Sequence, residues 1–216
     1  MVDVRGEPAL GLRERKKRRT RDTLINAAVG LCESQGFDGT TVDQIAAIAD
    51  VSPRTFSRYF ATKDAIVLAL IDDVLDLVAG ELERQPLALG NYEALRRAYV
   101  AMALRTQVAG KGELSSDRLL QIMRILVSSP TLRMSALEFR GNPVDVVVAR
   151  RMGVAVDDRR VQLVSVTFGA VLMTALTCLV DRGLQVGTVG VDDAVAVLEA
   201  TYAEFESEMA GYPQPV

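Results

Sequence analysis

The sequence predicts an all-helical protein with a three-helix N-terminal domain that contains a helix-turn-helix and a larger helical C-terminal domain. Residues 41–63 divide into two short helices joined by a tight turn. Along the rest of the chain, apolar residues recur three and four positions apart, as on one face of an α-helix. Glycine and proline interrupt this pattern where helices are expected to end. We expect a flexible tail over residues 1–12, a first domain over 13–63 and a second over 64–216.

The first helix is expected to begin at about Arg15 or Thr20 and to end at Gln35. Leu24, Ala28, Leu31 and Cys32 share one face of this helix. Gly36 supplies the left-handed residue that commonly terminates a helix. Cys32 is therefore predicted to lie in the core.

A basic run, RERKKRRTR, covers residues 13–21 with seven basic side chains and one glutamate. Such a run can be a solvated helix face or a disordered tail. Directly before a helix-turn-helix, it is expected to act as an arm that contacts DNA phosphates and makes affinity fall with salt. The predicted arm residues are Arg15, Lys16, Lys17, Arg18 and Arg19.

The second helix shows a start signal and one apolar face. Thr41 and Gln44 have the spacing of a capping box. Val42, Ile45, Ala46 and Ala49 follow at helical intervals. Asp50 comes next, and aspartate tolerates the left-handed backbone of a tight turn.

The third helix is expected to begin at once, with Ser52 as N-cap and Pro53 as its first residue. Phe56 and Phe60 share one face, which leaves polar side chains on the other. Arginine can donate two hydrogen bonds to a guanine edge, and hydroxyls and lysine suit phosphate oxygens. The alternative is a surface helical pair with scattered charges.

The patterns T-V-x-x-I-A-x-x-A and V-S-x-x-T-F-x-x-Y-F-x-x-K resemble the DNA-binding head of the TetR family of bacterial repressors. The resemblance implies a dimeric, all-helical repressor that responds to a small molecule. One departure is Asp50, where the family usually has glycine. Carried over by position, the resemblance predicts DNA contacts from Thr41, Gln44, Ser52, Pro53, Arg54, Thr55, Ser57, Arg58, Tyr59 and Lys63.

The second domain is predicted to be helical throughout. A helix from Lys63 to about Arg84 joins it to the head, and Pro86 ends that helix. Further helices are expected over residues 92–108, 117–128 and 131–152, the last with a kink or break at residues 141–143.

Residues 161–180 form an uncharged stretch that is long enough to span a membrane. Its hydroxyl and amide side chains, and the lack of an aromatic belt, favour a helix buried between protein neighbours. The last helix, about Asp192 to Met209, carries a coiled-coil-like seam. We expect these two helices to form a homodimer interface, although both can instead complete the monomer core. The predicted interface residues are Val171, Thr174, Val195, Leu198, Tyr202 and Phe205.

Large apolar side chains of the second domain can line a cavity for an apolar effector or can be plain core. The predicted pocket residues are Met102, Leu120, Met123, Phe139, Phe168 and Met173. The SSPTLR and RRMGV segments are distantly similar to TetR regulators that resemble the mycofactocin regulator, a resemblance that implies an acyl-CoA-like ligand. The arginines that can meet its phosphates are Arg96, Arg97, Arg118, Arg124, Arg133 and Arg140.

Composition indicates which domain meets DNA and argues against an enzyme. Residues 1–64 carry 11 basic and 9 acidic side chains, whereas residues 65–216 carry 14 and 19, so the head is the basic part. The chain has no histidine, no nucleophile-elbow or phosphate-loop motif and no metal-like spacing of its two cysteines, which are expected to be buried reduced thiols. We therefore expect no enzyme activity, cofactor or metal.

The absence of an apolar run in residues 1–12 predicts a cytoplasmic protein outside the membrane. Its expected partners are double-stranded operator DNA, a second copy of itself and a small apolar effector. The main alternative is an architectural DNA binder of the same family that has no effector.

Overall fold

The computed structural model describes residues 11–110, 112–184 and 187–211, and every regular element in these residues is a helix. The all-helical fold class is therefore confirmed. The chain divides into two compact units, Met1–Val67 and Leu68–Val216. Residues 1–10 of the expected flexible tail lie outside the described residues.

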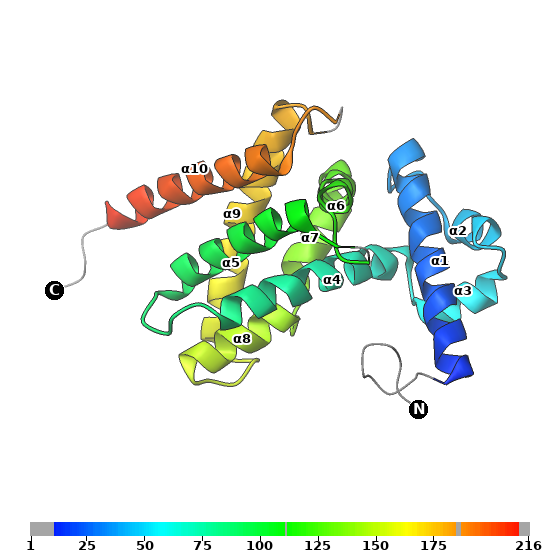
Figure 1. Ribbon diagram of the computed structural model, residues 1–216, viewed down its shortest axis with the longest axis horizontal. Coiled ribbons are helices and arrows are strands. Elements are labelled where there is room, and N and C mark those ends of the chain that lie inside the picture. Colours follow the sequence, from blue (N-terminus) through cyan, green and yellow to red (C-terminus); the bar gives the residue numbers. More distant parts are fainter. Residues whose placement is uncertain (1–10, 111, 185–186, 212–216) are drawn as a thin grey trace. The chain divides into compact units, whose positions relative to one another are not determined.

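Unit 1 contains α1 (Leu12–Gln35), α2 (Val42–Ile48), α3 (Pro53–Tyr59) and the first residues of α4 (Lys63–Glu83). In Figure 1 these are the blue and cyan helices, and α2 packs against both α1 and α3. Apolar side chains from all three helices fill the small core between them. Its members include Leu24, Ile25, Ala28, Phe37, Ile45, Ala46, Phe56 and Phe60.

The local signals that were expected to form the helix-turn-helix are present. The Thr41 side chain accepts a hydrogen bond from the Gln44 amide, and the Gln44 side chain accepts one from the Thr41 amide. Asp50 adopts φ 53° in the turn. The Ser52 hydroxyl caps α3 by accepting from the Thr55 amide at 3.1 Å. The predicted turn is therefore confirmed.

The first helix is longer than the sequence analysis expected, because α1 begins at Leu12. Residues 12–20 contain mostly arginine and lysine, which are good helix formers, and no proline or glycine interrupts them. The basic run therefore belongs to a continuous helix and is not an extended arm. Gly36 ends the helix with φ 77° and ψ 161°, so its φ is positive as predicted but its backbone is not in the left-handed helical region.

Unit 2 contains the remainder of α4 and a bundle built around one long helix, α9. Its elements are α5 (Asn91–Arg105), η1 (Thr106–Val108), α6 (Ser116–Ser128), α7 (Pro130–Glu138), α8 (Pro143–Met152), α9 (Arg159–Asp181) and α10 (Val191–Ala210). α9 contacts α5, α6, α7, α8 and α10. The predicted break at residues 141–143 is confirmed, since it separates α7 from α8.

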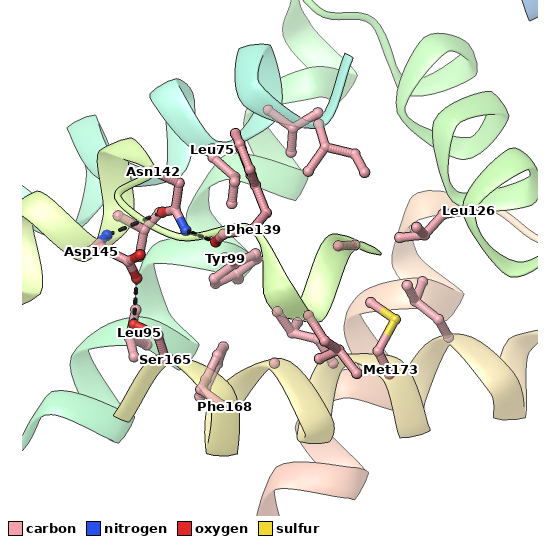
Figure 2. Close-up of a pocket in the computed structure, with 18 of the residues that line it drawn as sticks. Leu75, Leu95, Tyr99, Leu126, Phe139, Asn142, Asp145, Ser165, Phe168 and Met173 are labelled. Carbon is pink, nitrogen blue, oxygen red and sulfur yellow. Dashed lines mark hydrogen bonds between the residues drawn. The ribbon is translucent and has the colours of Figure 1, made fainter. Parts of the chain in front are cut away.

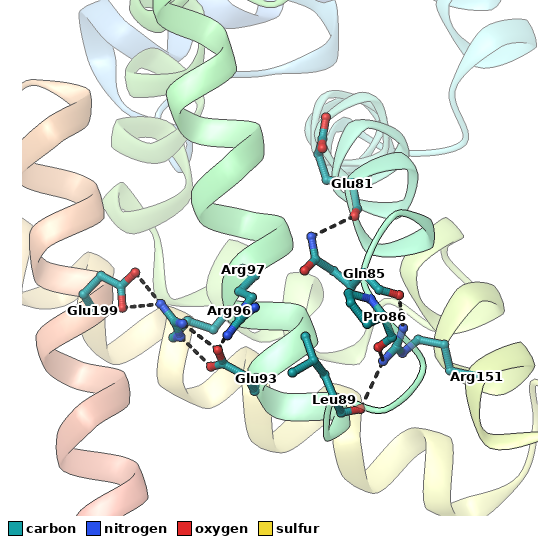
Figure 3. Close-up of polar contacts among 9 residues, drawn as sticks. All are labelled: Glu81, Gln85, Pro86, Leu89, Glu93, Arg96, Arg97, Arg151 and Glu199. Atoms are coloured by element: carbon teal, nitrogen blue, oxygen red, sulfur yellow. Dashed lines mark hydrogen bonds and ion pairs between the residues drawn. The ribbon is translucent and has the colours of Figure 1, made fainter.

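Two arginines hold unit 2 together through polar contacts (Figure 3). Arg96 on α5 pairs with Glu93 on its own helix and with Glu199 on α10. The hydrogen bond from Arg96 lowers the pKa of Glu93 to about 2. Arg151 on α8 donates to the carbonyl oxygens of residues 85, 86 and 89, which fixes the connection between α4 and α5.

Three of the side chains predicted to form the dimer seam are buried inside the protomer. Val171, Leu198 and Tyr202 are each less than 9% exposed. The ring centroids of Tyr202 and Phe168 on α9 lie 6.3 Å apart, and those of Phe205 and Tyr92 on α5 lie 5.5 Å apart. The seam of α10 therefore packs against its own chain, and the expectation that these three residues form the interface was wrong.

Helix α9 is only partly buried within the protomer, because one of its faces is exposed. Among the described residues, it is the one helix whose length and mean hydropathy, 2.2, suit a membrane span, and 33% of its most apolar window is buried. Leu163 is 64% exposed. Cys178 is also exposed, so the prediction of two buried thiols holds only for Cys32, whose pKa is raised by burial.

Candidate nucleic-acid interface and ligand cavity

Helix α3 separates an apolar face from a polar one. Phe56 and Phe60 are buried with ring centroids 5.9 Å apart. Arg54 and Arg58, one helical turn apart, are exposed on the other side of α3. The core contact thus sets the direction in which both guanidinium groups point.

Several polar side chains that were predicted to contact DNA are engaged within unit 1. Gln44 Oε1 accepts from the Thr41 amide at 2.9 Å and from Gln35 Nε2 at 3.0 Å. Ser52 and Thr55 pair through their hydroxyls at 3.0 Å. These contacts define the ends of α2 and α3, so the same side chains are needed for the fold of the head.

Two arginines and one tyrosine on the polar face of α3 make no hydrogen bonds within unit 1. Arg54, Arg58 and Tyr59 make no hydrogen bond or ion pair with any described residue. Arg58 lies over the Tyr59 ring, 5.4 Å from its centroid. We call Arg54, Arg58 and Tyr59 the α3 face. It offers forked donors of the kind that read guanine and phosphate.

The structure places Lys63 differently from the expected phosphate contact. Its ammonium donates to the carbonyl oxygens of Phe37 at 2.9 Å and Thr40 at 3.0 Å, and lies 4.3 Å from the Phe37 ring centroid. A third carbonyl, that of Asp38, lies at 3.4 Å. These contacts use the three donors of the ammonium. Lys63 therefore fixes the connection between α1 and α2, and its contact with DNA phosphate stays a prediction.

The five predicted arm residues, 15–19, are all exposed on the first turns of α1. Successive residues of an α-helix point about 100° apart, so these five side chains cannot all face one ligand. The Arg21 guanidinium lies 5.6 Å from the Phe60 ring centroid, at the end of α3. Lys17 and Arg18, four and three positions earlier, share the face of Arg21.

Unit 2 contains a partly open cavity of about 170 Å³ among α4, α5, α6, α7, α8 and α9 (Figure 2). Five of the six predicted pocket residues line it, namely Met102, Met123, Phe139, Phe168 and Met173. Leu120 does not line this cavity but a separate open groove beside α10. Its inclusion was wrong, because it lies on a different side of α6.

The cavity has an apolar end and a polar end. In Figure 2, Leu126 and Met173 lie at one end, whereas Asn142, Asp145 and Ser165 gather at the other. Asp145 is 3% exposed and accepts hydrogen bonds from the Ser165 hydroxyl at 2.5 Å and the Gly141 amide at 2.9 Å.

Tyr99 lies close to this polar end. Its pKa is raised by burial and by the negative charge of Asp145. Its ring packs on Phe168 with centroids 5.4 Å apart, and its hydroxyl makes no hydrogen bond with any described residue. The polar end therefore combines a carboxylate with an unengaged phenol.

The arginines expected to meet a phosphate-bearing ligand are mostly engaged elsewhere. Arg96 and Arg97 pair with Glu93, and Arg133 donates to the Val127 carbonyl. Arg118 donates to Gln121, and Arg124 lines the open groove beside α10. Of the six, Arg140 alone lines the cavity, and it donates to the Leu137 carbonyl.

Sequence reasoning missed the polar end of the cavity. Asp145 interrupts the apolar run Val144–Ala149, and Ser165 interrupts the uncharged stretch of α9. A polar residue within an apolar helical face is a weak signal for a site. Only the fold shows that residues from α5, α8 and α9 meet at one place.

Comparisons with known proteins agree with the helix-turn-helix. Residues 24–70 match the family model described as bacterial regulatory proteins, tetR family. The chain is 35% identical over 152 residues to the HTH-type transcriptional regulator TcmR of Streptomyces glaucescens, covering 68% of this chain and 67% of that one. It is 27% identical over 200 residues to the putative mycofactocin biosynthesis transcriptional regulator MftR of Mycobacterium tuberculosis, covering 91% and 93%.

A solved structure supports the same fold. It is Thermus thermophilus FadR, a TetR family transcriptional repressor in complex with lauroyl-CoA. The likeness covers 91% of this chain and 98% of that one, with a TM-score of 0.51 and 23% sequence identity. These comparisons show the fold and the relatives, which are transcription regulators and not enzymes.

Proposed function

Because the chain belongs to the TetR family of bacterial transcription regulators, we propose that it is a homodimeric repressor whose affinity for a palindromic operator is lowered by a small apolar effector. The observation that carries the DNA-binding part is the α3 face. Its two guanidinium groups and one phenol are directed outward by the buried Phe56 and Phe60 and make no hydrogen bond or ion pair among the described residues. A DNA groove supplies the acceptors that such donors need.

The proposed dimer uses the exposed sides of α9 and α10, and the occupant of this surface is a second copy of the chain. Exposed small or apolar side chains recur three and four positions apart on both helices. They are Leu163, Val166, Ala170, Thr174 and Thr177 on α9, and Ala196, Ala200 and Ala203 on α10. Two such stripes from each protomer can pack as a four-helix interface. Thr174 is the one residue of the expected seam that is exposed on this surface.

A dimer is also what a palindromic operator requires. A two-fold axis would place two α3 faces about one DNA turn apart, roughly 34–36 Å. It would bury the exposed apolar side of α9, which accounts for the high hydropathy of this helix.

The dimer is tested by Leu163→Glu, which introduces a charge into the proposed interface. Sedimentation equilibrium should show the dimer dissociation constant raised at least tenfold, because an unpaired carboxylate is costly to bury. Leu87→Glu is the matched control, since Leu87 is 79% exposed and lies between α4 and α5. Equal dissociation constants for both variants would place the interface elsewhere.

The operator is tested by selecting bound duplexes from a random pool with the purified protein. We expect enrichment of an inverted repeat whose half-site centres are about 10 base pairs apart or a multiple of one turn. An enriched motif without two-fold symmetry would contradict the dimer model. No enriched motif would favour the architectural binder, for which DNA contact is independent of sequence.

The effector part of the proposal is supported by the cavity and by the course of α4. Ile71, Val74 and Leu75 of α4 line the cavity, and Lys63, the first residue of the same helix, binds the loop that precedes α2. An effector that displaces α4 would therefore disturb the head through a continuous helix. An architectural binder would have no use for a cavity with a defined polar end.

An acyl-CoA-like effector has less support than a smaller molecule. The cavity of about 170 Å³ is close in volume to engineered cavities that hold a single benzene. Its polar end carries a carboxylate, which repels anions, and five of the six arginines expected to bind phosphates do not line the cavity. We therefore propose a compact effector.

A further inference from the structure

We infer that the cavity of unit 2 binds a small hydrophobic amine as its ammonium ion, with the cation at Asp145 and the apolar body toward Met173. This inference rests on the proposed function, because it names the chemical class of the effector. Three features carry it: a buried carboxylate without a cationic partner, aromatic rings beside it, and a cavity of limited volume.

Asp145 is 3% exposed and lies in the cavity wall, which Arg140 also lines. Its oxygens accept hydrogen bonds from a hydroxyl and a backbone amide, and neither donor is charged. No arginine or lysine within the described residues forms an ion pair with it. A buried carboxylate is costly unless a cation accompanies it. A ligand that brings a positive charge would therefore gain from this site.

Helix capping explains the backbone contact of Asp145 but not its burial. Asp145 is the third residue of α8 and accepts from the Gly141 amide at 2.9 Å. Asp193 holds the same position in α10 and accepts from the Gly190 amide at 2.8 Å, yet its side chain is exposed. A carboxylate at this helix position can thus accept from a preceding backbone amide, four residues earlier in α8 and three in α10, without being buried. What distinguishes Asp145 is its place in the wall of the cavity.

The surroundings of Asp145 suit an ammonium ion. Tyr99, Phe139 and Phe168 contribute aromatic rings to the same cavity (Figure 2). The faces of aromatic rings attract cations, and the effect is larger where water is excluded. The unengaged Tyr99 hydroxyl adds an acceptor for one N–H group of the ligand.

The opposite end of the cavity requires an apolar body. Leu126 and Met173 line it (Figure 2), and the volume of about 170 Å³ limits the body to about one ring with a short chain. A polyamine would leave charges in this apolar part, and an acyl-CoA would exceed the volume. An arylalkyl amine meets both limits.

The experiment compares three probes that share a phenyl ring and a two-carbon chain. They are 2-phenylethylamine, 2-phenylethanol and phenylacetate, and their binding to the full-length protein is measured by ligand-observed NMR titration at pH 7. We expect the amine to bind at least tenfold more tightly than the alcohol, and phenylacetate to bind more weakly than both. Equal binding of the amine and phenylacetate, or no binding of the amine, would overturn the inference.

Two variants show whether the preference arises at Asp145. Asp145→Asn should weaken the amine at least tenfold and the alcohol less than threefold, because the amide retains an acceptor for the Gly141 N–H but has no charge. Asp193→Asn removes the same type of capping carboxylate outside the cavity and should leave all three affinities unchanged. Circular dichroism melting of both variants checks that they fold. An amine-to-alcohol ratio that Asp145→Asn leaves unchanged would exclude Asp145 as the cation site.

A parallel DNA titration separates this inference from the proposed function. A protein that binds its operator but ignores the amine would refute the ligand class and leave the regulator intact. A protein that binds the amine at Asp145 but shows no sequence preference on DNA would retain the cavity site and refute the repressor.

Discussion

The two units of the chain place their charged groups in opposite ways. Unit 1 directs the guanidinium groups of Arg54 and Arg58 outward, away from a core of apolar side chains. Unit 2 directs the carboxylate of Asp145 inward, into the wall of a cavity. The difference fits two kinds of partner, since a long polyanion is met at a surface and a small molecule is enclosed.

The largest change in free energy is expected at Lys63, whose ammonium donates hydrogen bonds to backbone carbonyls within unit 1. Lys63→Met removes its hydrogen bonds to the Phe37 and Thr40 carbonyls and should destabilise unit 1 by about 2–3 kcal/mol. Hydrogen exchange of the α2 and α3 amides should rise accordingly, while that of α9 and α10 stays unchanged. Lys17→Met, at an exposed position of α1, is the control.

The Lys63 variant also distinguishes a structural role from a DNA contact. Unchanged exchange in α2 and α3, together with weaker binding to every duplex, would show that Lys63 contacts phosphate. Lys63 would then be a DNA-contacting residue, as we expect Arg54 and Arg58 to be.

A slightly smaller effect is expected for the outward arginines. Arg54→Ala or Arg58→Ala should cost about 1–3 kcal/mol of operator binding and relax the sequence preference at one position of each half-site. The melting temperature should change little, because neither side chain makes a hydrogen bond or ion pair within the described fold. Competition binding against operators with single base changes measures the loss of affinity and of sequence preference. A loss of affinity that is equal for every sequence would mean that the residue contacts phosphate only.

The smallest effect concerns the ion pairs of unit 2. Glu93→Gln should cost about 1 kcal/mol at pH 7, since it removes one of the two acidic partners of Arg96. The folded pKa of Glu93, about 2, lies below its ordinary value of 4.5. Its contribution to the unfolding free energy is therefore complete above about pH 4.5 and is lost as the pH falls toward 2.

Urea unfolding of the wild type and the variant between pH 2.5 and 7 tests this pH dependence. The difference between the two proteins should shrink as the pH falls. A constant difference across this range would show that Glu93 does not stabilise unit 2 through its charge.

The head could be predicted almost completely from the sequence because its signals are local. The Thr41 capping box, the Asp50 turn and the Ser52–Pro53 start each depend on residues within a few positions of one another. The role of Lys63 could not be predicted, because its partners lie 23 or more positions earlier in the chain.

The helices of unit 2 could be predicted from the sequence, but which of their faces pack against one another could not. The spacing of Val195, Leu198 and Tyr202 indicates one apolar side of α10, but it cannot tell whether that side faces its own chain or a second copy. The structure shows that Leu198 and Tyr202 pack internally, so a dimer must use the other side. The polar end of the cavity likewise depends on contacts among three helices that no local pattern encodes.

The most direct test of the regulator is a fluorescence-anisotropy titration against the DNA upstream of its own gene and against a scrambled duplex, at two salt concentrations. We predict tighter binding to the upstream DNA with two chains per duplex, and an affinity for both duplexes that falls with salt. Equal affinity for the two duplexes at both salt concentrations would contradict specific recognition of this DNA by the α3 face.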